Sequence, residues 1–302
     1  MDKCRGGIAS TATRGLVASE RTTSEADHSM RRLPCIATMF AALLLVTSAG
    51  AASYTLPQQP PGTGNLVFWI DHKTNQNFVF YDLVWYRSLA MLEDMTGNGN
   101  GFGQTNKVEQ PPAATSGGAV FRSGTFLPCA GGDMLAGAGQ VTLGFAFTLS
   151  SYSGAARRVL FDLPNPNAST EHQLEITVTG GTGTGSRVVE VTVQPNGGSA
   201  FTTGTAGTWQ LAPNIKHTLV VEVNLAANPA TINIYVDGLV YGPTNTFAST
   251  QAAFAGTPGG AIYLSNSTTA QAPLIGTLDG ALGYLSVDPV ERNAVISYLG
   301  GL

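Results

Sequence analysis

The sequence predicts an all-β fold, a sandwich of sheets closed by one short C-terminal helix, and three observations lead to it. The 302 residues include 37 glycines, and only 11% are charged, which is typical of many short strands joined by tight turns. Apolar residues make up 43% of the chain, enough for a real core and too many for a disordered chain. From residue 141 onward, apolar and polar residues alternate in repeated segments, which indicates strands that bury one face.

The first 51 residues predict a secretory signal peptide rather than part of the fold. Met30 precedes two arginines, residues 36–46 form an apolar run, and Ala-Gly-Ala at 49–51 fits the cleavage pattern. A buried N-terminal helix is the alternative. The apolar run is shorter than the roughly 20 residues that span a bilayer, so we expect no transmembrane segment. We expect a secreted protein, extracellular or periplasmic, and Met30 is an alternative start that would exclude the polar residues 1–29.

Removal of residues 1–51 changes the cysteine and charge balance. Cys129 is the one cysteine that remains, so we expect no disulfide within the fold. Nine basic and fifteen acidic residues remain, a formal net charge near −6. A mildly acidic surface without basic clusters argues against nucleic acid and anionic membranes as partners.

The predicted elements follow a Pro-rich linker at residues 52–64, and residues 65–302 form one domain. Strands are predicted where apolar residues alternate or run together, at residues 66–71, 141–149, 174–178, 189–193, 219–223, 232–236 and 274–287. Asp237-Gly238 is a strong hairpin turn signal, because both turn positions favour φ > 0. Asp288-Pro289 predicts a helix N-cap with Pro at the first position, and the helix ends at Gly300.

Several short motifs occur in the order of a known domain family. In chain order they are Trp69-x-Asp71, an Asp-x-Thr-Gly-Asn-Gly-Asn loop at 94–100, Gln104, two prolines at 111–112, Val120-Phe121 and Tyr-Val-Asp-Gly at 235–238. This order resembles the laminin-G-like, concanavalin A-type jelly-roll domains of secreted proteins. Thr96 stands where that family usually has Ser, and Leu92 where Trp is common. The resemblance implies a concanavalin A-like jelly-roll β-sandwich and a recognition domain.

The loop at 94–100 suggests a calcium site. Asp94, Asn98 and Asn100 place oxygen-bearing side chains along a Gly-rich turn, and calcium prefers several oxygen ligands. An EF-hand is excluded because Thr105 stands where a bidentate Glu is required. Asp71 or Asp279, from neighbouring strands, would have to complete the site. The alternative is that these Asx residues shape a turn through hydrogen bonds to the backbone.

Aromatic rings outside the predicted core positions are candidate platforms for a ligand. They are Trp85, Tyr86, Phe102, Trp209 and Tyr241, with Asn98, Asn100 and Asn245 as hydrogen-bonding partners. Each ring taken alone is more often packing than platform, because large aromatic side chains dominate protein cores.

Catalytic motifs are not found. Jelly-roll glucanases carry Glu-x-Asp-x-x-Glu on one strand, and this chain has no such sequence. Glu175 and Glu190 lie across the predicted hairpin, on the side opposite its apolar face. Two carboxylates about 5 Å apart would suit retaining glycoside hydrolysis, but the alternation predicts a solvated surface there, shared with Arg187. We therefore predict a protein that is not an enzyme.

The sequence thus predicts a secreted, non-catalytic, lectin-like domain. Carbohydrate is the ligand that the resemblance most often implies, although the fold also hosts other functions. A protein-binding, structural or adhesion module of an extracellular or envelope assembly is the alternative, with an extracellular or cell-surface protein as partner. A glycoside hydrolase or polysaccharide lyase ranks third.

Overall fold

The computed structural model describes eighteen segments of the chain. They are residues 63–71, 79–83, 86–92, 94–96, 98, 100–103, 113–115, 118–121, 127–129, 133–150, 157–166, 168–180, 187–194, 199–203, 211–249, 251–256, 262–264 and 274–302. All of them belong to one compact unit, Leu56–Leu302. The predicted signal peptide, residues 1–51, and residues 52–62 of the predicted linker lie outside the described segments.

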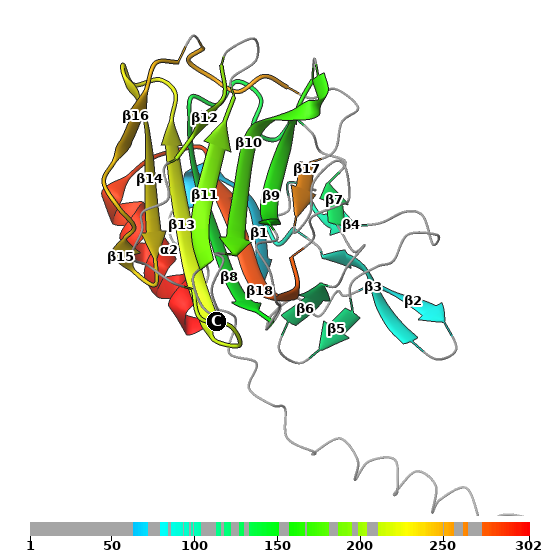
Figure 1. Cartoon of the computed structure of the whole chain (residues 1–302). Helices are drawn as coiled ribbons and strands as arrows, with labels where there is room; N and C mark the ends of the chain where they lie inside the picture. Colours follow the sequence, from blue (N-terminus) through cyan, green and yellow to red (C-terminus); the bar gives the residue numbers. More distant parts are fainter. Residues whose placement is uncertain are drawn as a thin grey trace, which may run out of the picture. The chain divides into compact units, whose positions relative to one another are not determined.

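The described residues form two antiparallel sheets and a short C-terminal helix, which confirms the predicted all-β sandwich (Figure 1). The larger sheet contains β1 (Leu66–Asp71), β2 (Val79–Leu83), β3 (Tyr86–Leu92), β4 (Phe102–Gly103), β5 (Ala113–Thr115), β6 (Gly118–Phe121), β8 (Gln140–Leu149), β13 (Lys216–Asn224), β14 (Ala230–Val236), β15 (Leu239–Val240), β16 (Asn245–Phe247) and β18 (Gly276–Tyr284). The smaller sheet contains β7 (Leu127–Cys129), β9 (Arg157–Asn165), β10 (Ala168–Gly180), β11 (Arg187–Val193), β12 (Phe201–Thr202) and β17 (Ile262–Leu264). A 3-10 turn, η1 (Thr63–Asn65), precedes β1, and the helix α2 spans Pro289–Gly301.

Strand order explains how the chain closes. The main path of the larger sheet is β15-β14-β13-β8-β18-β6-β5-β3-β2, and that of the smaller sheet is β12-β11-β10-β9-β17-β7. The last strand, β18, pairs with the first, so that Asp71 lies opposite Gly280. This pairing confirms that the predicted closing strand returns to the N-terminal one.

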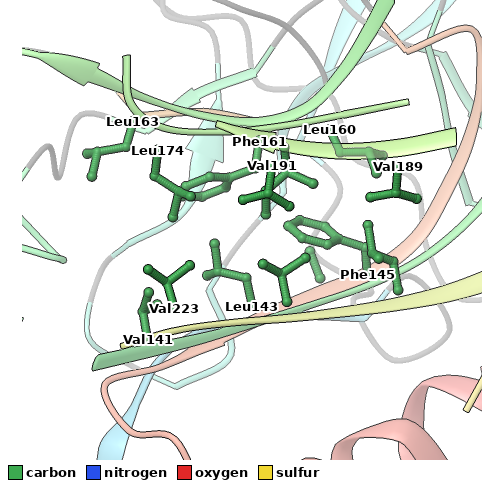
Figure 2. Packing of buried hydrophobic residues seen from close by; sticks show 14 of the residues in the cluster. Val141, Leu143, Phe145, Leu160, Phe161, Leu163, Leu174, Val189, Val191 and Val223 are labelled. Carbon is green, nitrogen blue, oxygen red and sulfur yellow. The ribbon is translucent and has the colours of Figure 1, made fainter. Parts of the chain in front are cut away.

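The principal core lies between the two sheets. Figure 2 shows Val141, Leu143 and Phe145 of the larger sheet facing Phe161 and Leu174 of the smaller one. The rings of Phe145 and Phe161 are 6.3 Å apart between centroids. Except for Phe161 of β9, these are alternating positions that the sequence assigns to buried strand faces, because successive side chains of a strand point to opposite sides.

The opposite face of the larger sheet is covered by α2, which lies against β8 and β13 (Figure 1). Val295, Tyr298 and Leu299 of the helix join a second apolar cluster with Trp69 of β1. The close approach depends on Gly144, where a Cβ would come within 2.9 Å of Leu299. β8 and β13 of the larger sheet are therefore buried on both faces, whereas no described helix covers the outer face of the smaller sheet.

The predicted helix cap and hairpin turn are both present. The Asp288 carboxylate accepts hydrogen bonds from the backbone N–H of Val290 and Glu291, at 2.6 and 3.3 Å, and Pro289 opens α2. Asp237 and Gly238 have φ of 51° and 79°, the left-handed conformation that a two-residue hairpin turn needs. No described helix is long and apolar enough to cross a membrane.

Candidate functional site

The outer face of the smaller sheet carries a row of polar residues that crosses its strands. Tyr263 of β17 pairs with Asp162 of β9, Asp162 with Glu175 of β10, Glu175 with Thr192 of β11, and Thr192 with Thr202 of β12. Residues directly opposite in antiparallel strands share a face of the sheet. We call these five residues the transverse row. Their strand neighbours are in the core, so the row points away from it.

The two carboxylates of the row are buried, which corrects the prediction of a solvated surface around Glu175. Asp162 and Glu175 are both 0% exposed. The reason is that longer side chains cover them. The guanidinium of Arg157 contacts Glu175, and the imidazole of His172 lies over both carboxylates.

Arg157 reaches Glu175 along the strand direction. It pairs with Thr179, four residues from Glu175 on β10. Val159 and Thr177, which lie between these levels, are both buried, as expected if the aliphatic part of the Arg157 side chain crosses them. The Arg157 side chain is still 44% exposed. Burial lowers the pKa of Arg157, and the charges of Glu190 and Asp162 oppose this shift.

The hydrogen bonds of the two carboxylates differ. His172 Nδ1 lies 2.7 Å from Asp162 Oδ1, whereas His172 Nε2 is 3.9 Å from Glu175 Oε1. The Arg157 guanidinium contacts Glu175 Oε2 directly, whereas Glu175 Oε1 has no hydrogen-bond partner among the described residues. A carboxylate can accept about four hydrogen bonds, and an unfilled acceptor inside a protein costs free energy. Glu175 therefore retains capacity for a donor.

Glu190 adds a third carboxylate on the same face. It pairs with Thr177, so it lies diagonal to Glu175 across the β10–β11 hairpin, on the same outward face. Its Oε2 accepts a 3.0 Å hydrogen bond from the Thr179 hydroxyl.

Sequence reasoning missed Asp162, Arg157 and His172. The one available signal was an Asp in the middle of the apolar run that ends at Leu163.

The loop at Asp94 has the geometry of a turn fastened to β1. Asp94 Oδ1 accepts from the backbone N–H of Trp69 and Thr96, at 2.9 and 3.0 Å. Oδ2 accepts from the Thr96 hydroxyl at 2.6 Å and from Asn100 N–H at 3.1 Å. The side-chain amides of Asn98 and Asn100 donate to the carbonyls of Leu66 and Val67, at 3.1 and 2.7 Å. The Asp94 carboxylate thus accepts four hydrogen bonds, the arrangement expected of a turn, and the calcium site stays a prediction.

The other two proposed calcium ligands lie on neighbouring strands, Asp71 on β1 and Asp279 on β18. Asp71 accepts a 2.8 Å hydrogen bond from the Tyr298 hydroxyl, which itself accepts from Trp69 Nε1 at 2.7 Å. Burial and the charge of Asp71 raise the pKa of Tyr298 well above its usual range. Asp279 lies at an irregularity of β18, next to Gly280. Within the described segments, no three acidic, His or Cys residues are placed to hold a metal.

The predicted aromatic platforms are not brought together by the described residues. Phe102 is fully buried, with its ring 5.5 Å from that of Phe68. Tyr241 is 3% exposed, and its hydroxyl accepts from Val189 N–H at 3.2 Å. Both belong to the core, which corrects their assignment as surface rings. Tyr86 begins β3, but its side chain lies outside the described residues, as do Trp85 and Trp209. Asn245 donates to Pro243 O at 3.2 Å.

Comparison with known proteins identifies the fold. No protein-family model and no curated protein matches this chain in sequence. Domain 4 of an extracellular GH43 arabinanase from Geobacillus stearothermophilus, in complex with arabinotriose, has a TM-score of 0.50 and 14% identity, covering 77% of this chain and 98% of that domain. A sialidase from Trypanosoma rangeli has a TM-score of 0.52 and 14% identity, covering 88% of this chain and 38% of the sialidase.

A GH54 α-L-arabinofuranosidase has a TM-score of 0.50 and 13% identity, covering 70% of this chain and 50% of that one. The chain thus spans about half or less of these two enzymes, but nearly the whole arabinanase domain. The similarity shows that this protein shares their β-sandwich fold.

Proposed function

We propose that this chain is a secreted, non-catalytic carbohydrate-binding domain, and that the transverse row is its binding site. The observation that supports this most is the Glu175 carboxylate, which lies buried on an outward sheet face and whose Oε1 has no hydrogen bond from any described residue. Sugar hydroxyls are donors that could fill this capacity. A small number of convergent polar groups of this kind is typical of ligand sites.

Two further features support a sugar as the ligand. Tyr263 lies in the row beside Asp162, and an aromatic ring next to hydrogen-bonding groups suits a ligand with both apolar and hydroxyl-bearing faces. The arabinanase domain with nearly complete coverage was solved with arabinotriose. We also propose that the chain belongs to the laminin-G-like family, on the motifs at Trp69, Asp94 and Asp237.

Binding is favoured over hydrolysis by the partners of the two carboxylates. Glycoside hydrolysis needs one carboxyl group as a protonated acid and another as base or nucleophile. Here Glu175 contacts the Arg157 guanidinium and Asp162 contacts His172. Both carboxylates are thus engaged by basic side chains, which supports a binding role rather than that of a proton donor.

The test is a glycan array probed with the protein obtained from the full chain, followed by calorimetry with the best glycan. Glu175→Gln should weaken binding at least about tenfold, because a hydrogen bond to a charged group contributes about 1.5–3 kcal/mol. Glu222→Gln is the matched control. Glu222 is also buried and lies 3.5 Å from Arg292, but on the α2 side of the larger sheet, so binding should be unchanged.

Absence of binding to any glycan by the folded protein would contradict the proposal and favour the protein-binding or adhesion module instead. Equal loss of binding in Glu175→Gln and Glu222→Gln would place the site elsewhere.

A further inference from the structure

We infer that the transverse row selects a cationic sugar, one with a protonated, unacetylated amine, and that the ligand's ammonium replaces the Arg157 guanidinium at Glu175. The inference rests on the proposed function and names the ligand class for the same site. In this view Arg157 mimics the ligand, because its positive guanidinium contacts Glu175 where the ammonium of the ligand would bind.

The charge of the site excludes an anionic ligand. Asp162, Glu175 and Glu190 bring three carboxylates to one face of three adjacent strands. Arg157 contacts Glu175 and interacts through its charge with Asp162 and Glu190, and His172 is charged only when protonated. An anion would therefore meet a surplus of like charge, which costs binding free energy.

A neutral ligand meets a different obstacle. While Arg157 stays in place, it covers Glu175. If a neutral sugar displaced it, Glu175 and Asp162 would remain opposite each other, with Cβ atoms about 4.5–5.5 Å apart, as buried like charges. Removing one partner of a buried ion pair is strongly unfavourable, because the remaining charge is left uncompensated. An ammonium avoids this cost, since it restores the charge.

An ammonium also supplies what the guanidinium does not. It is a compact group with three donors on a single nitrogen. Oε1 of Glu175 has no hydrogen-bond partner among the described residues, even though Arg157 contacts Oε2. A smaller cation that approaches from outside can orient its N–H groups toward these oxygens, whereas Arg157 must reach them from four residues away along the sheet.

Arg157 is placed so that it can leave. It is the first residue of β9 and its side chain is 44% exposed, so the guanidinium can turn into solvent without any strand unpairing. Partial burial already disfavours its charged form and lowers the pKa of Arg157, a cost that moving into water would remove.

The experiment compares three trisaccharides that differ at one position of each ring: glucosamine, N-acetylglucosamine and glucose. Calorimetry with the protein from the full chain should give the amine form an affinity at least about tenfold higher than the other two, since close charge pairs add this much or more. The difference should shrink with added salt, because screening weakens charge attraction.

Substitutions separate displacement from a purely structural role of Arg157. Arg157→Gln should bind the glucosamine trisaccharide several-fold more tightly than the unsubstituted protein, because the competing cation is gone. Glu175→Gln should lose the preference for the amine. Glu222→Gln serves again as control, and thermal melting checks that each variant is folded. If Arg157→Gln does not fold, the ligand comparison and Glu175→Gln decide the matter.

Equal affinity for the three trisaccharides would overturn the inference and leave the proposed function standing. Weaker binding of the amine by folded Arg157→Gln would also overturn it, since Arg157 would then hold the ligand rather than compete with it. If no trisaccharide and no glycan of the array binds, both proposals fail. Binding of a lysine-rich peptide without any amino sugar would show a protein-recognition surface instead.

Discussion

At the scale of single residues, the fold uses carboxylates in two distinct ways. The partly buried Asp94 receives four hydrogen bonds from the turn and from β1, so its charge is satisfied locally. Glu175 is fully buried, yet its Oε1 has no hydrogen bond from any described residue. A carboxylate whose acceptors are all filled stabilises a loop, whereas a buried carboxylate with an unfilled acceptor can take a further hydrogen bond from a ligand.

Asp94→Ala should destabilise the protein without any connection to calcium. The substitution leaves the N–H groups of Trp69 and Asn100 without their acceptor in a partly buried place. Each such group costs about 1–3 kcal/mol, so the free energy of unfolding should fall by roughly that amount or more, measured by urea denaturation.

Asp94→Asn, which keeps one side-chain oxygen as acceptor, should lose less than Asp94→Ala. The melting temperature of the unsubstituted protein should be equal in calcium and in chelator. A rise with calcium that Asp94→Ala abolishes would contradict the turn interpretation and restore the metal hypothesis, because a ligand that binds only the native state must raise the midpoint.

At the scale of strands and turns, the sequence predicted correctly those features that depend on neighbouring residues. The alternation in β8, β10 and β14 identified the core-facing residues correctly, and Asp237-Gly238 and Asp288-Pro289 formed the turn and the cap that their residue types favour. In each case the outcome depends on the strand period or on backbone preferences within a few residues.

The candidate site was not predictable in the same way. Register shifts interrupt the β9–β10 ladder near His172 and between Ile176 and Thr177, so counting residues cannot show that Asp162 faces Glu175. Alternation shows that Glu175 points outward, but it cannot show that Arg157 covers it. The burial of Phe102 and Tyr241 likewise follows from long-range packing, because neither lies in a periodic run long enough to indicate a face.

The contact between Asp237, in the turn after β14, and β13 should make a pH-dependent contribution to stability. Partial burial alone would raise the pKa of Asp237. Hydrogen bonds from His217 Nδ1 and Thr218 N–H, both 2.8 Å long, outweigh the effect of burial, so the pKa of Asp237 lies below its ordinary value. A carboxyl whose folded pKa is depressed stabilises the fold above its unfolded pKa, about 3.9 for Asp. That contribution is lost as the pH falls through the folded pKa.

Asp237→Asn isolates this effect, because Asn also accepts φ > 0 beside Gly238 and keeps the turn. The melting temperature of the unsubstituted protein should exceed that of the variant near pH 6, and the difference should disappear on acidification below about pH 4. A difference that stays constant down to pH 2 would show that the Asp237 charge does not carry it.

At the scale of the whole molecule, the distribution of covered faces determines where a ligand can bind. The larger sheet packs against the smaller sheet on one side and against α2 on the other. The smaller sheet has one face in the core, and the described residues place no helix on the other. Polar residues concentrate on that outer face, so the binding proposals follow from how the layers are arranged as well as from any one residue.

Export of the chain is the prediction that concerns the molecule as a whole. Residues 36–46 are apolar but too short to span a bilayer, and small residues at positions 49 and 51 suit a signal peptidase. Sequencing the N-terminus of secreted material should therefore find Ala52 first. Ala51→Arg places a large, charged residue immediately before the predicted cleavage site, so it should leave the precursor uncut, while Ala52→Ser should be processed normally.

A secreted protein that retains residues 36–46, or one that begins near Met1, would show that the segment is not a cleaved signal. Cleavage at Ala52 in the unsubstituted chain and its loss in Ala51→Arg alone would establish the site.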